Sequence, residues 1–300
     1  MAFKNIVLFA ICMISLFSCT DKKTIELSLI AKKGYGPFAP NLNQAMIISP
    51  KNGIEDLYSN ISGFPTDWTD VKHGIFETNG LQATYQKYAQ GDMSKKEYEN
   101  IQESSMYIPD TLSLSKKPIR TKIAFVCGKD STNEFKMIVD ANNNLNFSDD
   151  VIFTPIIIDD NQPGNLDSLA QFNSLDVAYE RFINNKIEKI TSPILIVYNN
   201  RTERIYYNFS QYMVARLEGE EIAVRSDFFR DFAFQYPWLV LIDEELKTGN
   251  KVADEKIILK NGYIEIKEKF YKVLGISNIR NALILERTKL KKNLLTSNQV

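Results

Sequence analysis

Residues 137–158 read MIVDANNNLNFSDDVIFTPIII, and this stretch decides how the rest of the chain is interpreted. Apolar runs begin and end it, and a dense series of Asn and Asp residues lies between them. Phe135, Met137 and Val139 fall at alternate positions, which is the periodicity of a β-strand. Residues 151–158 are mostly β-branched or aromatic and predict a second strand. The stretch therefore predicts a strand–loop–strand unit whose loop gathers oxygen ligands.

The loop at residues 140–150 presents acids and amides at alternate positions, as a Ca²⁺ site does. The candidate ligands are Asp140, Asn142, Asn144, Asn146, Asp149 and Asp150. Their spacing follows an EF-hand loop, but Leu145 replaces the usual glycine and Val151 replaces the usual bidentate acid. The alternative is an Asx-rich loop that is held by hydrogen bonds from side chains to backbone. The hydrogen-bonded loop is the leading interpretation, and a weakly bound Ca²⁺ is the alternative; no other cofactor is predicted.

The N-terminus has the pattern of an exported protein. Lys4 precedes an apolar run at residues 6–17, which is too short to span a bilayer comfortably. The run ends in Ser18-Cys19, which resembles the lipobox of bacterial lipoproteins. The resemblance implies that residues 1–19 hold a lipoprotein signal peptide, with cleavage before Cys19 and acylation of that cysteine. An ordinary secretory signal with a chance cysteine is the alternative.

Charge and residue counts exclude several classes of function. The net charge is -1, so no basic field is available to bind nucleic acid. Beyond the predicted signal, Cys127 is the single cysteine, so the body has a free thiol and neither a C-x-x-C pair nor an intrachain disulfide. His73 is the one histidine, and beside Gly74 it is interpreted as a surface residue of a loop. A histidine-rich metal site and a Ser-His-Asp triad are therefore disfavoured.

Residues 20–118 are predicted to be a tether and a mixed region that contains a helical hairpin at 78–104. Leu81, Tyr85 and Tyr88 form one apolar stripe, and Gly91 marks the end of the first helix. Ser94-x-x-Glu97 is a capping box that opens the second helix. The hairpin is expected to pack on the protein's own sheet.

The remainder predicts a mainly β protein of antiparallel, sandwich-like meander sheets. One β module spans residues 119–245, with a two-residue turn at Asn184-Asn185. A C-terminal meander spans residues 250–290, and the strands 257–260 and 263–266 are expected to pair across Asn261-Gly262. Residues 288–300 form a polar tail or linker.

The lipobox, the loop DANNNLNFSDD and the meander YIEIKEKFYKV together resemble a family of envelope lipoproteins from Gram-negative bacteria. In these proteins a β-rich N-terminal region precedes a thioredoxin-like domain of the TlpA type. The family's redox residues are a C-x-x-C pair, and Cys127 alone does not match it, so no catalytic residue is assigned. The tail at 288–300 resembles the connector before that domain, which predicts either a longer parent protein or a lost redox domain.

The leading functional expectation is a non-catalytic, lipid-anchored lipoprotein of the cell envelope that faces the periplasm or the cell surface and acts as a scaffold or binding module. Its partners would be the membrane, through the lipid on Cys19, and an unidentified protein or small molecule. The alternatives are an accessory region of a thiol-disulfide oxidoreductase and, third, a glycan or peptide hydrolase.

Overall fold

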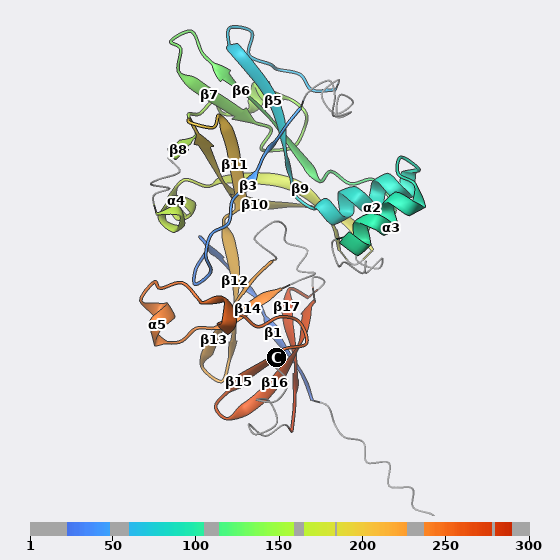
Figure 1. The fold of residues 1–300 in the computed structure, drawn as a ribbon, viewed down its shortest axis with the longest axis vertical. Coiled ribbons are helices and arrows are strands. Elements are labelled where there is room, and N and C mark those ends of the chain that lie inside the picture. The colour runs from blue at the N-terminus through green and yellow to red at the C-terminus, as the bar shows by residue number, and fades with distance from the viewer. Residues whose placement is uncertain are drawn as a thin grey trace, which may run out of the picture.

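The computed structural model describes residues 23–48, 60–104, 114–158, 165–183, 185–226, 237–277 and 280–289. It is mainly β, with antiparallel sheets and a few short helices, which confirms the predicted fold class. Figure 1 shows the sheets following one another along the long axis, with the hairpin of α2 (Gly80–Gln90) and α3 (Lys95–Ser104) at one side. None of the described helices is long and apolar enough to cross a membrane. The predicted signal peptide, Cys19 and most of the tail lie outside the described residues.

Two sheets fill the upper part of Figure 1. The β5 sheet is antiparallel throughout, and its strands in spatial order are β4 (Met46–Ile47), β5 (Thr69–Glu77), β6 (Lys122–Lys129) and β7 (Phe135–Val139). The β10 sheet has the order β3 (Asn43–Gln44), β11 (Arg204–Phe209), β10 (Lys186–Asn199) and β8 (Ile156–Ile158), and β9 (Leu175–Ile183) also pairs with β10.

Two further sheets fill the lower part. The β12 sheet has the order β14 (Trp238–Leu241), β13 (Glu220–Arg225), β12 (Gln211–Leu217) and β2 (Ile30–Lys33). The β16 sheet has the order β1 (Thr24–Ser28), β17 (Ala282–Arg287), β16 (Lys269–Ser277) and β15 (Tyr263–Ile266). Short helices α4 (Leu166–Phe172) and α5 (Glu244–Lys247) and 3₁₀ turns at Phe147–Asp149 and Asp254–Lys256 lie between strands.

Residues 20–118, predicted to be a tether and a mixed region, contribute strands to all four sheets. β1 pairs with β17 near the end of the chain, and β2 pairs with β12. The main apolar core contains buried residues from every sheet, among them Phe125, Ile196, Val224 and Leu283. Burial of these side chains away from water is the main favourable contribution to folding. The four sheets therefore share one continuous core.

One predicted strand differs from the structure. Only Ile156–Ile158 of the stretch 151–158 is a strand, and it pairs parallel with β10. A 3₁₀ turn precedes this stretch and Pro155 interrupts it, and proline has no N–H to donate to a ladder. Residues 204–217 form two strands, β11 and β12, which are divided at Ser210 and belong to different sheets. Ile205, Tyr207 and Phe209 are buried as their shared face predicts.

The prediction for the Asn261-Gly262 hairpin was wrong. Asn261 does turn the chain, with φ of 71°, but residues 257–260 do not pair with β15. β15 pairs instead with β16 across Lys267-Glu268, whose φ angles are 48° and 64°. Ile258, three residues before Asn261, bridges to Leu239 on β14. Contact with β14 therefore replaces the local pairing that the Asn-Gly signal favours.

The turn between β9 and β10 agrees with its prediction. Ile183 pairs with Lys186, so a two-residue connection joins the strands. Asn185 has φ of 59°, in the left-handed region that asparagine tolerates. Asn184 lies outside the described residues.

The helical hairpin is confirmed. α2 spans Gly80–Gln90 and ends at Gly91, whose φ is 85°. α3 spans Lys95–Ser104, and Ser94 and Glu97 form the predicted capping box, because each side chain accepts the other residue's backbone N–H.

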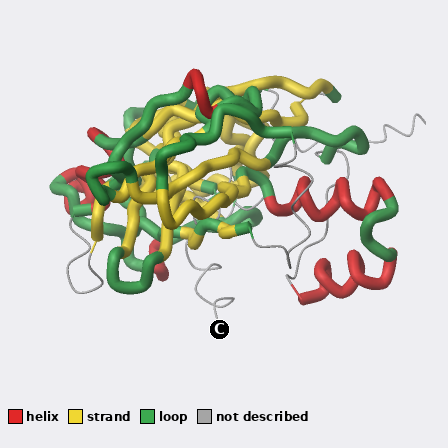
Figure 2. The backbone as a smooth tube through the Cα atoms, turned by 90° about the horizontal axis from the view of Figure 1, so that it is seen from above, coloured by secondary structure: helices red, strands yellow, loops and turns green. Residues whose placement is uncertain are grey.

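The hairpin does not pack on the sheet cores as expected. Tyr85 and Tyr98 form a separate apolar cluster with Leu114, and Figure 2 shows the two helices standing beside the strands. The Gln82 side chain instead exchanges two hydrogen bonds with the backbone of Ser115. The Gln86 side chain does the same with Ile119. These four bonds fix the hairpin to the segment that leads into β6.

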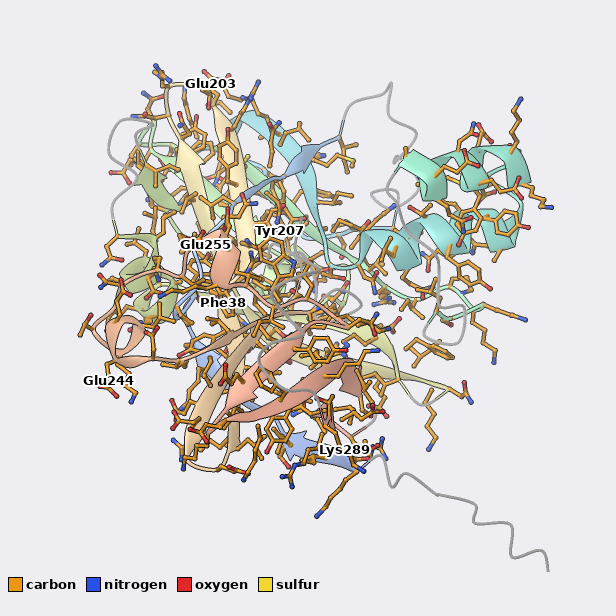
Figure 3. The ribbon with its side chains drawn as sticks, turned by 60° about the horizontal axis from the view of Figure 1, so that its bottom comes forward. Phe38, Glu203, Tyr207, Glu244, Glu255 and Lys289 are labelled. Carbon is orange, nitrogen blue, oxygen red and sulfur yellow. The ribbon has the colours of Figure 1, made fainter. Side chains whose placement is uncertain are left out.

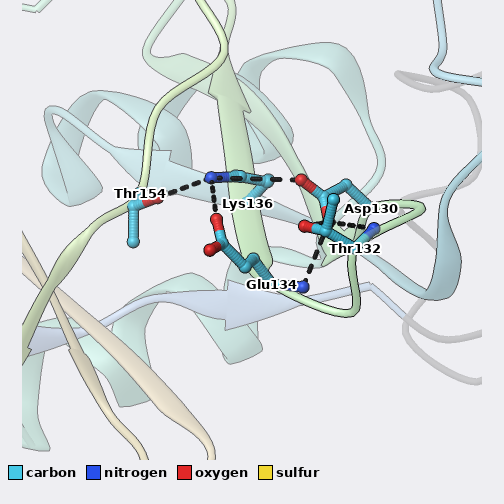
Figure 4. Close-up of polar contacts among 5 residues, drawn as sticks. All are labelled: Asp130, Thr132, Glu134, Lys136 and Thr154. Atoms are coloured by element: carbon cyan, nitrogen blue, oxygen red, sulfur yellow. Dashed lines mark hydrogen bonds and ion pairs between the residues drawn. The ribbon is translucent and has the colours of Figure 1, made fainter.

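The turn between β6 and β7 is held by Asp130 (Figure 4). Its Oδ1 accepts hydrogen bonds from the backbone N–H of Thr132 and Glu134. Lys136 Nζ lies 2.7 Å from a Glu134 oxygen and donates to Thr154 Oγ1. The turn is thereby joined to the segment that leaves the Asp/Asn-rich loop.

Candidate functional site

The Asp/Asn-rich loop is built around Asp140, which directly follows β7 and is fully buried. One carboxylate oxygen accepts the Asn144 N–H at 2.9 Å and the other accepts the Leu145 N–H at 2.9 Å. The chain must turn sharply to bring these N–H groups together, and Asn143 and Leu145 have φ of 54° and 68°. A left-handed leucine is strained. Asp140 therefore stabilises a left-handed backbone conformation at Leu145 that leucine does not favour.

The other predicted ligands mostly bond to one another. The amide nitrogens of Asn142 and Asn144 donate to the same oxygen of Asp149, at 3.0 and 2.8 Å. Asn146 Oδ1 accepts the Ser148 N–H, and Asp150 Oδ1 accepts the Ala141 N–H. The six residues thus come together as predicted, in the pattern expected of a hydrogen-bonded Asx loop.

Two side-chain oxygens of the loop receive no hydrogen bond from the described residues. Asn142 Oδ1 and Asp150 Oδ2 are buried and accept no hydrogen bond from any described residue. Burial, together with the charges of Asp140 and Asp149, raises the pKa of Asp150 to about 6. Among the residues that the structure describes, no three His, Cys, Asp or Glu side chains are arranged to hold a metal ion. The two oxygens are the local feature that a cation would satisfy, and Ca²⁺ binding stays a prediction.

The Ca²⁺ prediction can be checked by thermal unfolding. If the loop binds Ca²⁺ with the weak affinity of extracellular modules, about 10⁻⁴ to 10⁻³ M, then about 10 mM Ca²⁺ should stabilise the fold by about 1–3 kcal/mol. The melting temperature should therefore rise with Ca²⁺ and fall back with a chelator. Equal melting temperatures in Ca²⁺, Mg²⁺ and chelator would leave the hydrogen-bonded loop as the sole interpretation.

Cys127 lies inside β6 and is fully buried. Burial raises the pKa of its thiol to about 12, and Sγ lies 3.7 Å from the Lys72 carbonyl oxygen, to which it donates. Since the thiolate is the nucleophile, this cysteine is a packing residue with little reactivity.

We expect the chain to show no disulfide reductase activity in an insulin-reduction assay, because a dithiol cycle needs two reactive thiols. Ellman's reagent should react with Cys127 only after the protein is unfolded with denaturant. Turnover of insulin that survives Cys127→Ser, or rapid labelling of the native thiol, would contradict this assignment.

Three pockets border the segment at residues 114–122, which connects the hairpin to β6. The largest, of about 650 Å³, includes Lys116, Lys117 and Lys186 in its lining. The smallest, of about 210 Å³, lies between α2 and the Asp/Asn-rich loop and includes Arg120. The third, of about 400 Å³, lies between the hairpin and β5. Concave sites with apolar walls and a few polar groups are the usual places where small molecules bind.

We name the third pocket the hairpin pocket. One of its lining residues, Glu77, is an acid whose pKa is raised. Its lining residues are Met46, Ile75, Glu77, Gly80, Ala83, Thr84, Lys87, Met93, Ile101 and Lys122. Burial raises the pKa of Glu77 to about 7. Tyr207, labelled in Figure 3, fixes the Glu77 backbone, because its hydroxyl accepts the Glu77 N–H and donates to the Glu77 carbonyl oxygen. A carboxyl group with a shifted pKa in a pocket is a recognised mark of a functional site.

His73 is part of β5 and stacks on Phe64 with ring centroids 5.0 Å apart, so its prediction as a loop residue was wrong. The hairpin pocket was not among the sequence predictions. Glu77 and Lys122 come from strands that pair directly, but the segment between them is long and includes the hairpin. The signal that could have indicated this pocket was Glu77, an acid at the last position of β5, just before the cap of α2.

A scan against protein-family models and searches of curated proteins and of solved structures found no match.

Proposed function

We propose that this protein is a non-catalytic lipoprotein of the bacterial cell envelope, held to a membrane by lipid on Cys19, whose β-rich body binds a small molecule. The N-terminal sequence supports the anchor, since an apolar run of signal-peptide length ends in Ser18-Cys19. Several acyl chains on one cysteine anchor a protein stably.

The single observation that carries the binding role is the hairpin pocket. It combines apolar walls with three charged residues in its lining, Glu77, Lys87 and Lys122. Its volume of about 400 Å³ falls in the range of about 300–1,000 Å³ that is usual for ligand sites. A redox role has less support, because the thiol of Cys127 is buried and its pKa is raised.

Washing of isolated membranes tests the anchor. High salt and alkaline carbonate should leave the protein in the membrane pellet, because acyl chains are held by the hydrophobic effect and are insensitive to ionic strength. A protein attached only by surface charges would be released by salt, and that result would contradict the proposed anchor.

A further inference from the structure

The hairpin pocket joins an apolar surface to positive charge. Ile75 is buried at its wall, whereas Met46 and Ile101 are 47% and 37% exposed and leave apolar surface open to solvent. Met46 comes from β4 and Ile101 from α3, so two parts of the fold converge on one apolar space. Methionine side chains adapt to irregular ligands, and Met46 and Met93 both line the pocket.

The positive charge comes from Lys87 on α2 and Lys122 on β6, and neither forms an ion pair with a described residue. Residues 114–122 read LSKKPIRTK, with four bases and no acid, in a chain whose net charge is -1. Among the described residues that line the three pockets, Glu77 is the one acid. Lys122 lies opposite Glu77 across the β5–β6 pair, but two bases against one acid leave a net positive charge here, beside apolar walls, that an anion could neutralise.

We propose that the hairpin pocket binds an amphipathic carboxylate of the fatty-acid class, with its alkyl chain against Met46, Ile75 and Ile101 and its carboxylate between Lys87 and Lys122. The charges of the lining favour an anionic head group, because the ammonium groups of Lys87 and Lys122 outnumber the single carboxyl group of Glu77, which is easily protonated. A hydrogen bond between ionised partners is about twice as strong as a neutral one. The alkyl chain gains free energy by leaving water. This inference rests on the proposed binding function.

Glu77 makes the proposed binding depend on pH. The groups that face its carboxyl are Lys122 directly opposite on β6, the Thr121 side chain and the Asn79 N–H, which donates to Oε1 at 3.3 Å. Lys87 on α2 lines the same pocket, and the Tyr207 hydroxyl bonds the Glu77 backbone. Burial raises the pKa of Glu77 to about 7, so at pH 8 its negative charge opposes a bound carboxylate. At pH 6 the group is mostly neutral. The ligand stays charged at both values, because ordinary carboxyl groups titrate near about pH 4.

Octanoate is the probe for calorimetric titration, with the full acylated chain in lipid nanodiscs and empty nanodiscs as the blank. We expect one octanoate per chain, bound about tenfold more tightly at pH 6 than at pH 8, since the apparent affinity scales with the fraction of neutral Glu77. Glu77→Gln should remove this pH dependence and keep the tighter affinity. Lys87→Gln with Lys122→Gln should weaken binding by about fivefold or more.

The control is Lys116→Gln with Lys117→Gln, which removes two charges from the 650 Å³ pocket and should leave octanoate affinity unchanged. Ala83→Leu fills the hairpin pocket without altering charge and should weaken octanoate and octanol alike. Tighter binding of octylamine than of octanoate, unchanged affinity in the Lys87/Lys122 variant, or no saturation above the blank would overturn the inference. The membrane-wash result is independent of these outcomes, so failure of the anchor and failure of the ligand assignment are distinguishable.

Discussion

Replacement of Cys19 by alanine should move the protein from the membrane pellet to the soluble fraction. Each buried methylene group of an acyl chain contributes about 0.8 kcal/mol to membrane binding, so several chains of ordinary length make dissociation negligible. Without the acceptor thiol no chain is attached, and the largely polar sequence after Cys19, TDKKT, offers no apolar substitute. The expected change is close to complete, and it is measured by ultracentrifugation and immunodetection.

The matched control is Cys12→Ala, which removes a cysteine from the apolar run and leaves the proposed acceptor in place. It should remain in the pellet and incorporate a fatty-acid analogue in metabolic labelling, whereas Cys19→Ala should not. Wild-type protein that takes up no label, or a Cys19→Ala variant that still sediments with membranes, would end the lipoprotein interpretation.

Asp140→Ala should destabilise the fold more than any other change in the Asp/Asn-rich loop. The carboxylate is fully buried, and its two oxygens accept the N–H groups of Asn144 and Leu145. Truncation leaves both donors without a partner, and a buried unsatisfied group costs about 1–3 kcal/mol. We expect the free energy of unfolding to fall by about 3 kcal/mol in urea denaturation.

Asp149→Ala removes an acid from the same loop at an exposed position and serves as the comparison. Its oxygen accepts two side-chain amides, which water can replace, so the loss should be under about 1 kcal/mol. Equal losses for the two variants would show that Asp140 does not organise the loop.

Local signals were sufficient to predict the helical hairpin. Gly91 ends α2 because glycine adopts a positive φ without steric penalty, and the Ser94/Glu97 box forms within a single turn. The loop at 140–150 was predictable for the same reason, since Asx side chains bond to backbone only a few residues away.

Long-range pairing determined the features that the sequence did not reveal. The Asn-Gly signal at Asn261 predicts a turn correctly, but pairing of Ile258 with Leu239 decides which strand β15 meets. β1 pairs with β17 at the opposite end of the chain, and no periodic pattern in the sequence predicts a pairing over so long a separation. The hairpin pocket depends on the same kind of contact, because Glu77 and Lys122 become neighbours only when β5 and β6 pair.

Mass spectrometry of the N-terminal peptide of the mature protein decides whether Cys19 carries the proposed lipid anchor. This peptide should begin at Cys19 and carry the added mass of a diacylglyceryl group. A mature chain that begins at another residue, or an unmodified Cys19, would contradict the proposed anchor.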